Sequence, residues 1–222
     1  MQRTAFKRSR KWLTELVCDR HELLDIAIRQ ASPLVLSESI DWRSPRPPKY
    51  REYRDRTALR ALDLGDLGAE LTRFWPARGP VWDALGVGRA NQERFLVEAK
   101  AHIQELVSTP TGAKAGALTR IRKRLTDLKR SLHSKAPADW AGTFYQYSNP
   151  LAYLDWLRRR QVPAFLVCIY FTHAPDVPEP VGRRQWEGAL SVLHSYLGLG
   201  THRLKPFILD LFLDATTGRV AA

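Results

Sequence analysis

The residues best suited to chemistry are an aspartate, a glutamate and a lysine on two short apolar segments. Asp83 lies within residues 79–85, and Glu98 and Lys100 lie near the end of residues 94–100. Both segments have the composition of strands, and the residues between them are typical of a hairpin turn. Pairing would bring together two carboxylates and an ammonium group, which are costly to bury because like charges repel and hydration is lost. A divalent metal ion would offset that cost.

The spacing within the second segment indicates what such a site could do. Glu98 and Lys100 are two residues apart, so on a strand both side chains point to the same face. The carbonyl oxygen of Ala99, with the carboxylates of Asp83 and Glu98, would supply the oxygen ligands that Mg²⁺ or Mn²⁺ prefers. Such a metal polarises a phosphate and activates a bound water, while Lys100 orients that water or stabilises negative charge. Alternatively, Glu98 and Lys100 form an ordinary surface pair and Asp83 caps a turn.

The overall charge favours an anionic partner. The chain has 222 residues, a formal net charge of +12 and a pI of about 10.1. Nucleic acid, and DNA in particular, is the leading candidate, and no apolar run approaches the roughly 20 residues that would span a bilayer. Two distant cysteines, Cys18 and Cys168, cannot form a disulfide framework or a zinc site alone, which favours a reducing cytoplasm. A homodimer is compatible with these data.

The first 57 residues differ in character from the rest. Apolar spacing predicts a helix over 8–30, after a basic entry. Residues 31–57 are rich in proline, which rules out a long helix, and residues 43–56 alternate basic with aromatic side chains. That alternation suits a surface that follows a phosphate backbone, or an extended strap whose aromatic rings pack on the core. We therefore divide the chain into an N-terminal helix and basic arm, 1–57, and a core, 58–222.

The core shows a mixture of helical and strand patterns. One or two short helices are expected within 58–74, broken near Gly65 and Gly68. A nearly continuous apolar run predicts a buried central strand over 164–171, and residues 207–213 predict a last strand. Together with the hairpin, these elements predict an α/β fold with a mixed central sheet. The further helices are expected over 114–133, 147–160 and 183–197.

The hairpin resembles the PD-(D/E)XK nuclease superfamily. The superfamily pattern is an acid on one hairpin strand and acid-x-lysine on the next. Here it takes the form Pro80-Val81-Trp82-Asp83 followed by Glu98-Ala99-Lys100, with two residues between proline and aspartate. The resemblance covers roughly residues 66–172 and is closest to a small bacterial or phage branch. It implies a restriction-endonuclease-like α/β/α sandwich with an N-terminal helical and basic extension, and a Mg²⁺- or Mn²⁺-dependent phosphodiesterase.

The resemblance adds candidates around the hairpin. Glu70, on the helix before it, would join the metal ligands, although Asp66 or Asp63 could serve instead. His102 follows Lys100 at strand spacing and would contact a phosphate or a metal-bound water, or else make a structural hydrogen bond. Gln146 would lie near the site at a helix start, with a role in nucleic-acid contact.

The helix over 114–133 is the candidate nucleic-acid surface. Its apolar stripe is flanked by basic residues that only Asp127 offsets. The alternative is that these charges keep the helix soluble while the arm at 43–56 holds the substrate. Two further functions remain open for the chain, a non-catalytic nucleic-acid-binding protein and an interaction subunit of a larger assembly. The basic residues that we expect to contact DNA are Arg120, Lys123, Arg124 and Lys129.

Overall fold

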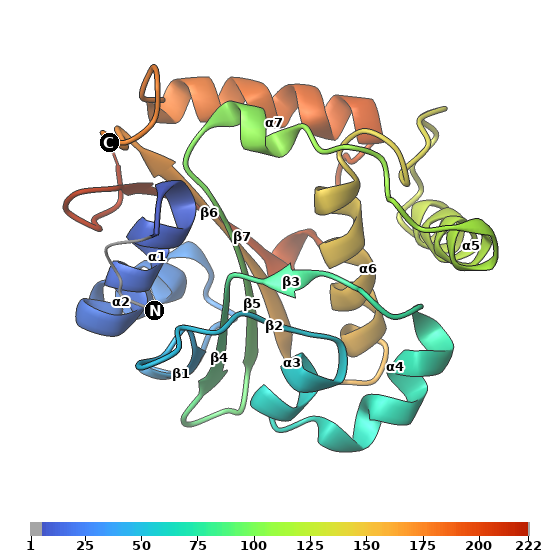
Figure 1. Cartoon of the computed structure of the whole chain (residues 1–222), viewed down its shortest axis with the longest axis horizontal. Helices are drawn as coiled ribbons and strands as arrows, with labels where there is room; N and C mark the ends of the chain where they lie inside the picture. The colour runs from blue at the N-terminus through green and yellow to red at the C-terminus, as the bar shows by residue number, and fades with distance from the viewer. Residues whose placement is uncertain (1–5, 222) are drawn as a thin grey trace.

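A five-stranded mixed sheet organises the molecule (Figure 1). The computed structural model describes residues 6–221. The strand order is β1-β4-β5-β6-β7, in which β1, β4 and β5 pair antiparallel while β5, β6 and β7 run parallel. The chain is therefore an α/β protein with a mixed sheet, as the sequence predicts. The strands are β1 (Ile40–Ser44), β4 (Ala84–Gly88), β5 (Arg94–Lys100), β6 (Ala164–Thr172) and β7 (Ile208–Asp214).

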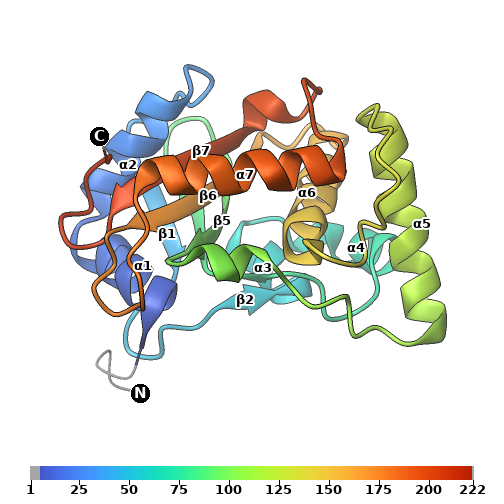
Figure 2. The same cartoon turned by 90° about the horizontal axis from the view of Figure 1, so that it is seen from above.

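Helices cover both faces of this sheet. Helices α1 (Arg8–Asp19) and α2 (His21–Ala31) lie on one side, and α5 (Ala115–Ser131) and α6 (Tyr145–Arg158) lie on the other (Figure 2). Helix α7 (Arg183–Leu197) packs into the same core as α5 and α6. No helix within residues 6–221 has the length and apolar character needed to cross a membrane.

Side-chain alternation along the inner strands builds the two cores. On β5, Phe95 and Val97 join the core under α1 and α2, whereas Leu96 joins the core under α6 and α7. Every residue of β6 is buried, which matches the apolar run in the sequence. The prediction that this strand is central needs a correction, because β5 is the middle strand and β6 lies between β5 and β7.

The short elements before the hairpin frame the candidate site. Strand β2 (Tyr53–Arg54) pairs antiparallel with β3 (Val81–Trp82), and α3 (Asp55–Ala61) follows β2 directly. Helix α4 (Gly68–Phe74) comes after a 3₁₀ turn at Gly65–Leu67, so the predicted break near these glycines is confirmed.

The N-terminal segment departs from the predicted pattern in two ways. The single helix expected over 8–30 is two helices, because Arg20 takes non-helical angles of φ −144° and ψ 33°. Strand β1 lies inside the proline-rich segment and pairs with β4, so residues before 58 form part of the central sheet. Trp42 on β1 is buried, and its indole Nε1 donates to Asp25 Oδ1 at 2.9 Å. This side chain packs on the core and is closed to a nucleic-acid base.

Candidate active site at the end of strand β5

Asp83 lies at the point where β4 begins, beside the middle of β5. Its backbone N–H donates to Val97 O at 3.1 Å, and its Oδ2 accepts from the backbone N–H of Ala99 at 2.8 Å. The antiparallel pairing predicted for the hairpin is confirmed, with Ala84 opposite Val97. Because successive residues of a strand direct their N–H and C=O groups to alternate sides, the Ala99 carbonyl faces the same edge as Asp83.

Glu98 and Lys100 share the face of β5 that the sequence predicts. Lys100 Nζ lies 3.3 Å from Glu98 Oε2, and each side chain is only 16% exposed. The charge of Asp83 acts on both of these groups, so Asp83, Glu98 and Lys100 form one electrostatically coupled cluster.

The electrostatics of this cluster reflect burial first and charge second. Burial raises the pKa of Glu98 to about 8, against the attraction of Lys100 and with the repulsion of Asp83. Burial likewise raises the pKa of Asp83, and Lys100 and the Ala99 N–H oppose it. Burial lowers the pKa of Lys100, but Glu98 and Asp83 outweigh burial and leave that pKa raised. At neutral pH the cluster therefore holds a charged lysine and an extra proton, which a divalent cation would displace.

Glu52 is a third carboxylate of this cluster, and sequence reasoning missed it. Burial raises its pKa, Arg10 lowers it, and the charge of Asp83 raises it further. Glu52 in turn raises the pKa of Glu98. Glu52 and Asp55 are the two acids within the basic and aromatic segment 43–56, and this contrast is the signal in the sequence that could have pointed to Glu52.

Glu105 and Gln146 line a small cavity with Glu98 and Lys100. The cavity measures about 20 Å³, which is room for about one water molecule and too little for a phosphate group. Glu105 Oε1 is buried with no hydrogen-bond partner among the described residues, and its Oε2 accepts from Ser9 Oγ at 3.2 Å. Gln146 thus lies near the site as predicted, at the start of α6.

His102 does not continue the site face of β5. The strand ends at Lys100, and a 3₁₀ turn begins at Ile103. His102 Nδ1 accepts from the backbone N–H of Gln104 at 3.2 Å, so the ring caps this turn. His102 therefore makes a structural hydrogen bond, which is the second of the two roles that the sequence left open.

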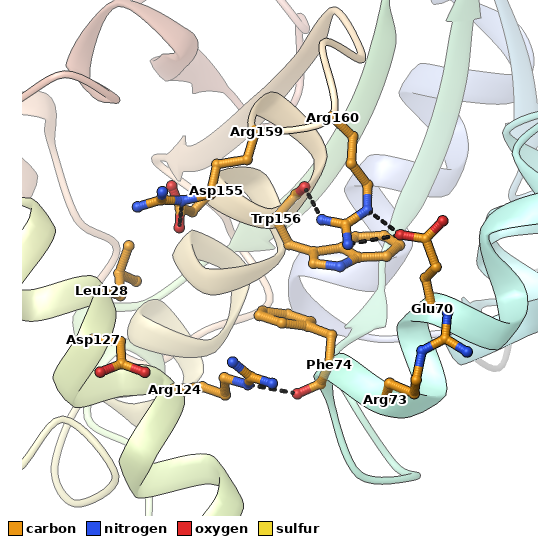
Figure 3. A pocket seen from close by; sticks show the side chains of 10 residues that line it. All are labelled: Glu70, Arg73, Phe74, Arg124, Asp127, Leu128, Asp155, Trp156, Arg159 and Arg160. Carbon is orange, nitrogen blue, oxygen red and sulfur yellow. Dashed lines mark hydrogen bonds and ion pairs between the residues drawn. The ribbon is translucent and has the colours of Figure 1, made fainter.

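Glu70 lies in a different pocket from Asp83 and Glu98. Arg160 binds it through Nε and Nη2, each 2.8 Å from Glu70 Oε2, while the same guanidinium stacks on Trp156 (Figure 3). The pocket measures about 410 Å³ and lies between α4, α5 and α6. The prediction that Glu70 joins Asp83 as a metal ligand is therefore not supported by this arrangement. Asp63 pairs with Arg43, and neither Asp63 nor Asp66 is among the charges that shift the pKa of Asp83 or Glu98.

The basic residues of α5 are largely engaged with the protein itself. Arg120 Nη2 donates to Thr72 O at 2.8 Å, Arg124 Nε to Phe74 O at 3.2 Å, and Lys129 Nζ to Ala138 O at 3.0 Å. These groups satisfy backbone carbonyls, two of them at the end of α4, which would otherwise lack partners. Of the four predicted DNA contacts, these three have structural partners, and Lys123 is exposed.

The donor set fits a divalent ion in chemical type. Asp83 and Glu98 each engage only one carboxylate oxygen in a hydrogen bond among the described residues, and the buried Glu105 Oε1 has no donor. Oxygen ligands of this kind suit Mg²⁺ or Mn²⁺. Within residues 6–221, however, no three His, Cys, Asp or Glu side chains are already arranged to hold a metal. The Glu98 carboxylate would have to turn from Lys100 to share an ion with Asp83.

Comparisons with known proteins found no match: no family model, curated protein or solved structure is similar to this chain.

Proposed function

We propose that this protein is a metal-dependent nuclease that hydrolyses phosphodiester bonds in DNA, on a restriction-endonuclease-like core. The observation that carries the proposal is the cluster of Asp83, Glu98 and Lys100 at the end of β5. Burying these groups together raises the pKa of both carboxylates, an electrostatic cost that serves no visible structural purpose. The mixed sheet with helices on both faces supports the same reading.

In this proposal each group has a defined role. Asp83 and Glu98 hold Mg²⁺ or Mn²⁺, together with the Ala99 carbonyl at the same strand edge. Glu52 takes the place that the sequence assigned to Glu70, as the further acid of the site. When bound, the metal polarises the phosphate and lowers the pKa of a bound water. Lys100, held charged by its neighbours, orients the attacking water or stabilises negative charge on the phosphate oxygens.

A second candidate function is a nucleic-acid-binding protein without catalysis. Two observations favour it: the Glu98–Lys100 ion pair is closed, and the described residues hold no preformed group of three metal ligands. The net charge of +12 serves either function equally.

The test is incubation of the purified protein with supercoiled, linear and branched DNA, and with RNA, in Mg²⁺, Mn²⁺ or EDTA. The nuclease proposal expects metal-dependent cleavage that EDTA abolishes. Retarded migration of DNA without cleavage under every condition would favour the binding protein.

A further inference from the structure

The first turn of α1 contacts two acids at the border of the carboxylate cluster. Ser9 Oγ donates to Glu105 Oε2 at 3.2 Å, and Arg10 Nε lies 3.1 Å from Glu52 Oε1. Two neighbouring residues of one helix thus contact two different acids of the cluster. The cavity beneath Glu98 and Lys100 holds about one water, so a phosphate must approach from elsewhere. The side chains of Arg10 and Glu52 are 39% and 24% exposed, which leaves this side open to a ligand.

Three contacts hold Arg10 in one orientation. Besides the Glu52 ion pair, Nη2 donates to Tyr50 O at 3.3 Å, and the guanidinium lies 4.3 Å from the centroid of the Phe6 ring. Nη1 has no hydrogen-bond partner among residues 6–221. A guanidinium that is fixed at two nitrogens, and whose third nitrogen binds none of residues 6–221, is prepared to bind an oxyanion with little loss of rotamer freedom.

The charge of Arg10 also affects which ions the cluster can bind. Four carboxylates, those of Glu52, Asp83, Glu98 and Glu105, face two cations, Lys100 and Arg10. The positive charge of Arg10 acts on Glu52 and on Asp83. A divalent ion at Asp83 would be repelled by Arg10, whereas a phosphate would be attracted by both cations.

We propose that Arg10 binds a phosphate of the nucleic-acid strand beside the metal site, and thereby makes metal binding and strand binding reinforce each other. The proposal rests on the proposed function and names the group of α1 that contacts the substrate. Without a strand, Arg10 weakens metal binding. With a strand bound, the phosphate neutralises that repulsion and metal affinity rises.

The test measures Mn²⁺ affinity by electron paramagnetic resonance, with and without a 20-base-pair duplex whose phosphorothioate linkages slow cleavage. For the wild type, the duplex should tighten Mn²⁺ binding by about fivefold or more, within the usual range of coupling between two ligands. Arg10→Gln should bind Mn²⁺ alone about twofold to fivefold more tightly, and the duplex should then have almost no effect. Arg10→Lys keeps the charge, so its Mn²⁺ affinity without duplex should stay near that of the wild type.

Arg8→Gln is the matched control, because it removes the same charge two residues away. The backbone N–H of Arg8 donates to Asp176 Oδ2 at 2.8 Å, and its charge is not among those that shift the pKa of Glu52, Asp83 or Glu98. This variant should keep the wild-type coupling. Wild-type coupling in Arg10→Gln, or weaker Mn²⁺ binding in that variant with a normal circular dichroism spectrum, would overturn the proposal. Cleavage of unmodified DNA by the wild type, measured in parallel, reports separately on the nuclease proposal, and a wild type that binds no Mn²⁺ overturns both.

Discussion

At the scale of single residues, the protein keeps a carboxyl group where its ionised form is disfavoured. Glu98 has a pKa of about 8, mainly because burial strips its hydration. A site assembled only for stability would gain from a neutral side chain here, since removing an unfavourable buried charge is often stabilising. The charged groups at the end of β5 therefore indicate function, and two predictions follow from their titration.

The first prediction concerns stability against pH. The folded pKa of Glu98, about 8, lies above its unfolded value near 4.5, so between these values the folded state binds the extra proton. This contribution is fully present below about pH 4.5 and is lost as pH rises through 8. Glu98→Gln mimics the protonated form, so its unfolding free energy should equal that of the wild type near pH 5 and exceed it by on the order of 1–3 kcal/mol at pH 9. Urea unfolding at both pH values measures this difference. If the difference in unfolding free energy between variant and wild type is the same at pH 5 and pH 9, the prediction is wrong.

The second prediction concerns metal binding against pH. A carboxylate must lose its proton to bind a metal, so Mn²⁺ affinity should rise between pH 6 and pH 8 and then level off. Each bound ion should release up to about one proton, which titration calorimetry in two buffers of different ionisation enthalpy detects. Glu70→Gln serves as the comparison, because it removes a carboxylate from a different pocket and leaves the Glu98 carboxyl in place. Binding that does not depend on pH would exclude Glu98 as a ligand.

At the scale of elements, close packing joins the N-terminal segment to the β4–β5 hairpin. Gly86 on β4 lies opposite Trp42 on β1, and a Cβ at Gly86 would come within 2.5 Å of Ile40 Cγ2. The two strands can approach only because residue 86 has no side chain. The orientation of β4, and with it the position of Asp83, therefore depends on residues far earlier in the chain.

Gly86→Ala should consequently destabilise the protein by about 1–3 kcal/mol, the usual cost of overpacking a core. Gly188→Ala is the control, because Gly188 lies within α7 and a Cβ there meets nothing within 4 Å. Alanine favours the helix more than glycine does, so this variant should gain about 0.5–1 kcal/mol in unfolding free energy. Urea unfolding of both variants tests the account. Equal stability of the two would show that β1 and β4 are not held in this close contact.

Helix α5 gives a prediction that separates binding from folding. Arg124→Gln should lower the unfolding free energy by about 1 kcal/mol, because it removes the donor to Phe74 O at the end of α4. Lys123 is exposed, so Lys123→Gln should leave stability unchanged. If α5 contacts DNA, Lys123→Gln reduces the slope of log K against log salt by about 0.9. An unchanged slope would place the DNA away from this face and favour the arm at 43–56.

At the scale of the whole molecule, the sequence predicts the features that depend on residues close together in the chain. The apolar run of β6 and the spacing of Glu98 and Lys100 depend on neighbours in sequence, so the buried strand and the shared face were predicted. The position of Glu52 could not be predicted, because it depends on the packing of α1 and β2 against the hairpin. Glu70 shows the converse error: its place before the hairpin suggested a ligand, but Arg160, ninety residues later, binds it elsewhere. The hairpin residues of the site can therefore be predicted from sequence, whereas the residues around them depend on tertiary packing.

The measurement that tests the central claim most directly is cleavage of supercoiled plasmid by the wild type, Asp83→Asn and Glu98→Gln in Mg²⁺ or Mn²⁺. Both substitutions keep side-chain shape and remove the carboxylate charge, so the protein should stay folded and DNA affinity, set mainly by backbone charge, should change little. We expect metal-dependent cleavage by the wild type and a loss of at least about a hundredfold in each variant. Undiminished cleavage in either variant, or a wild type that binds DNA and never cleaves it, would contradict the account.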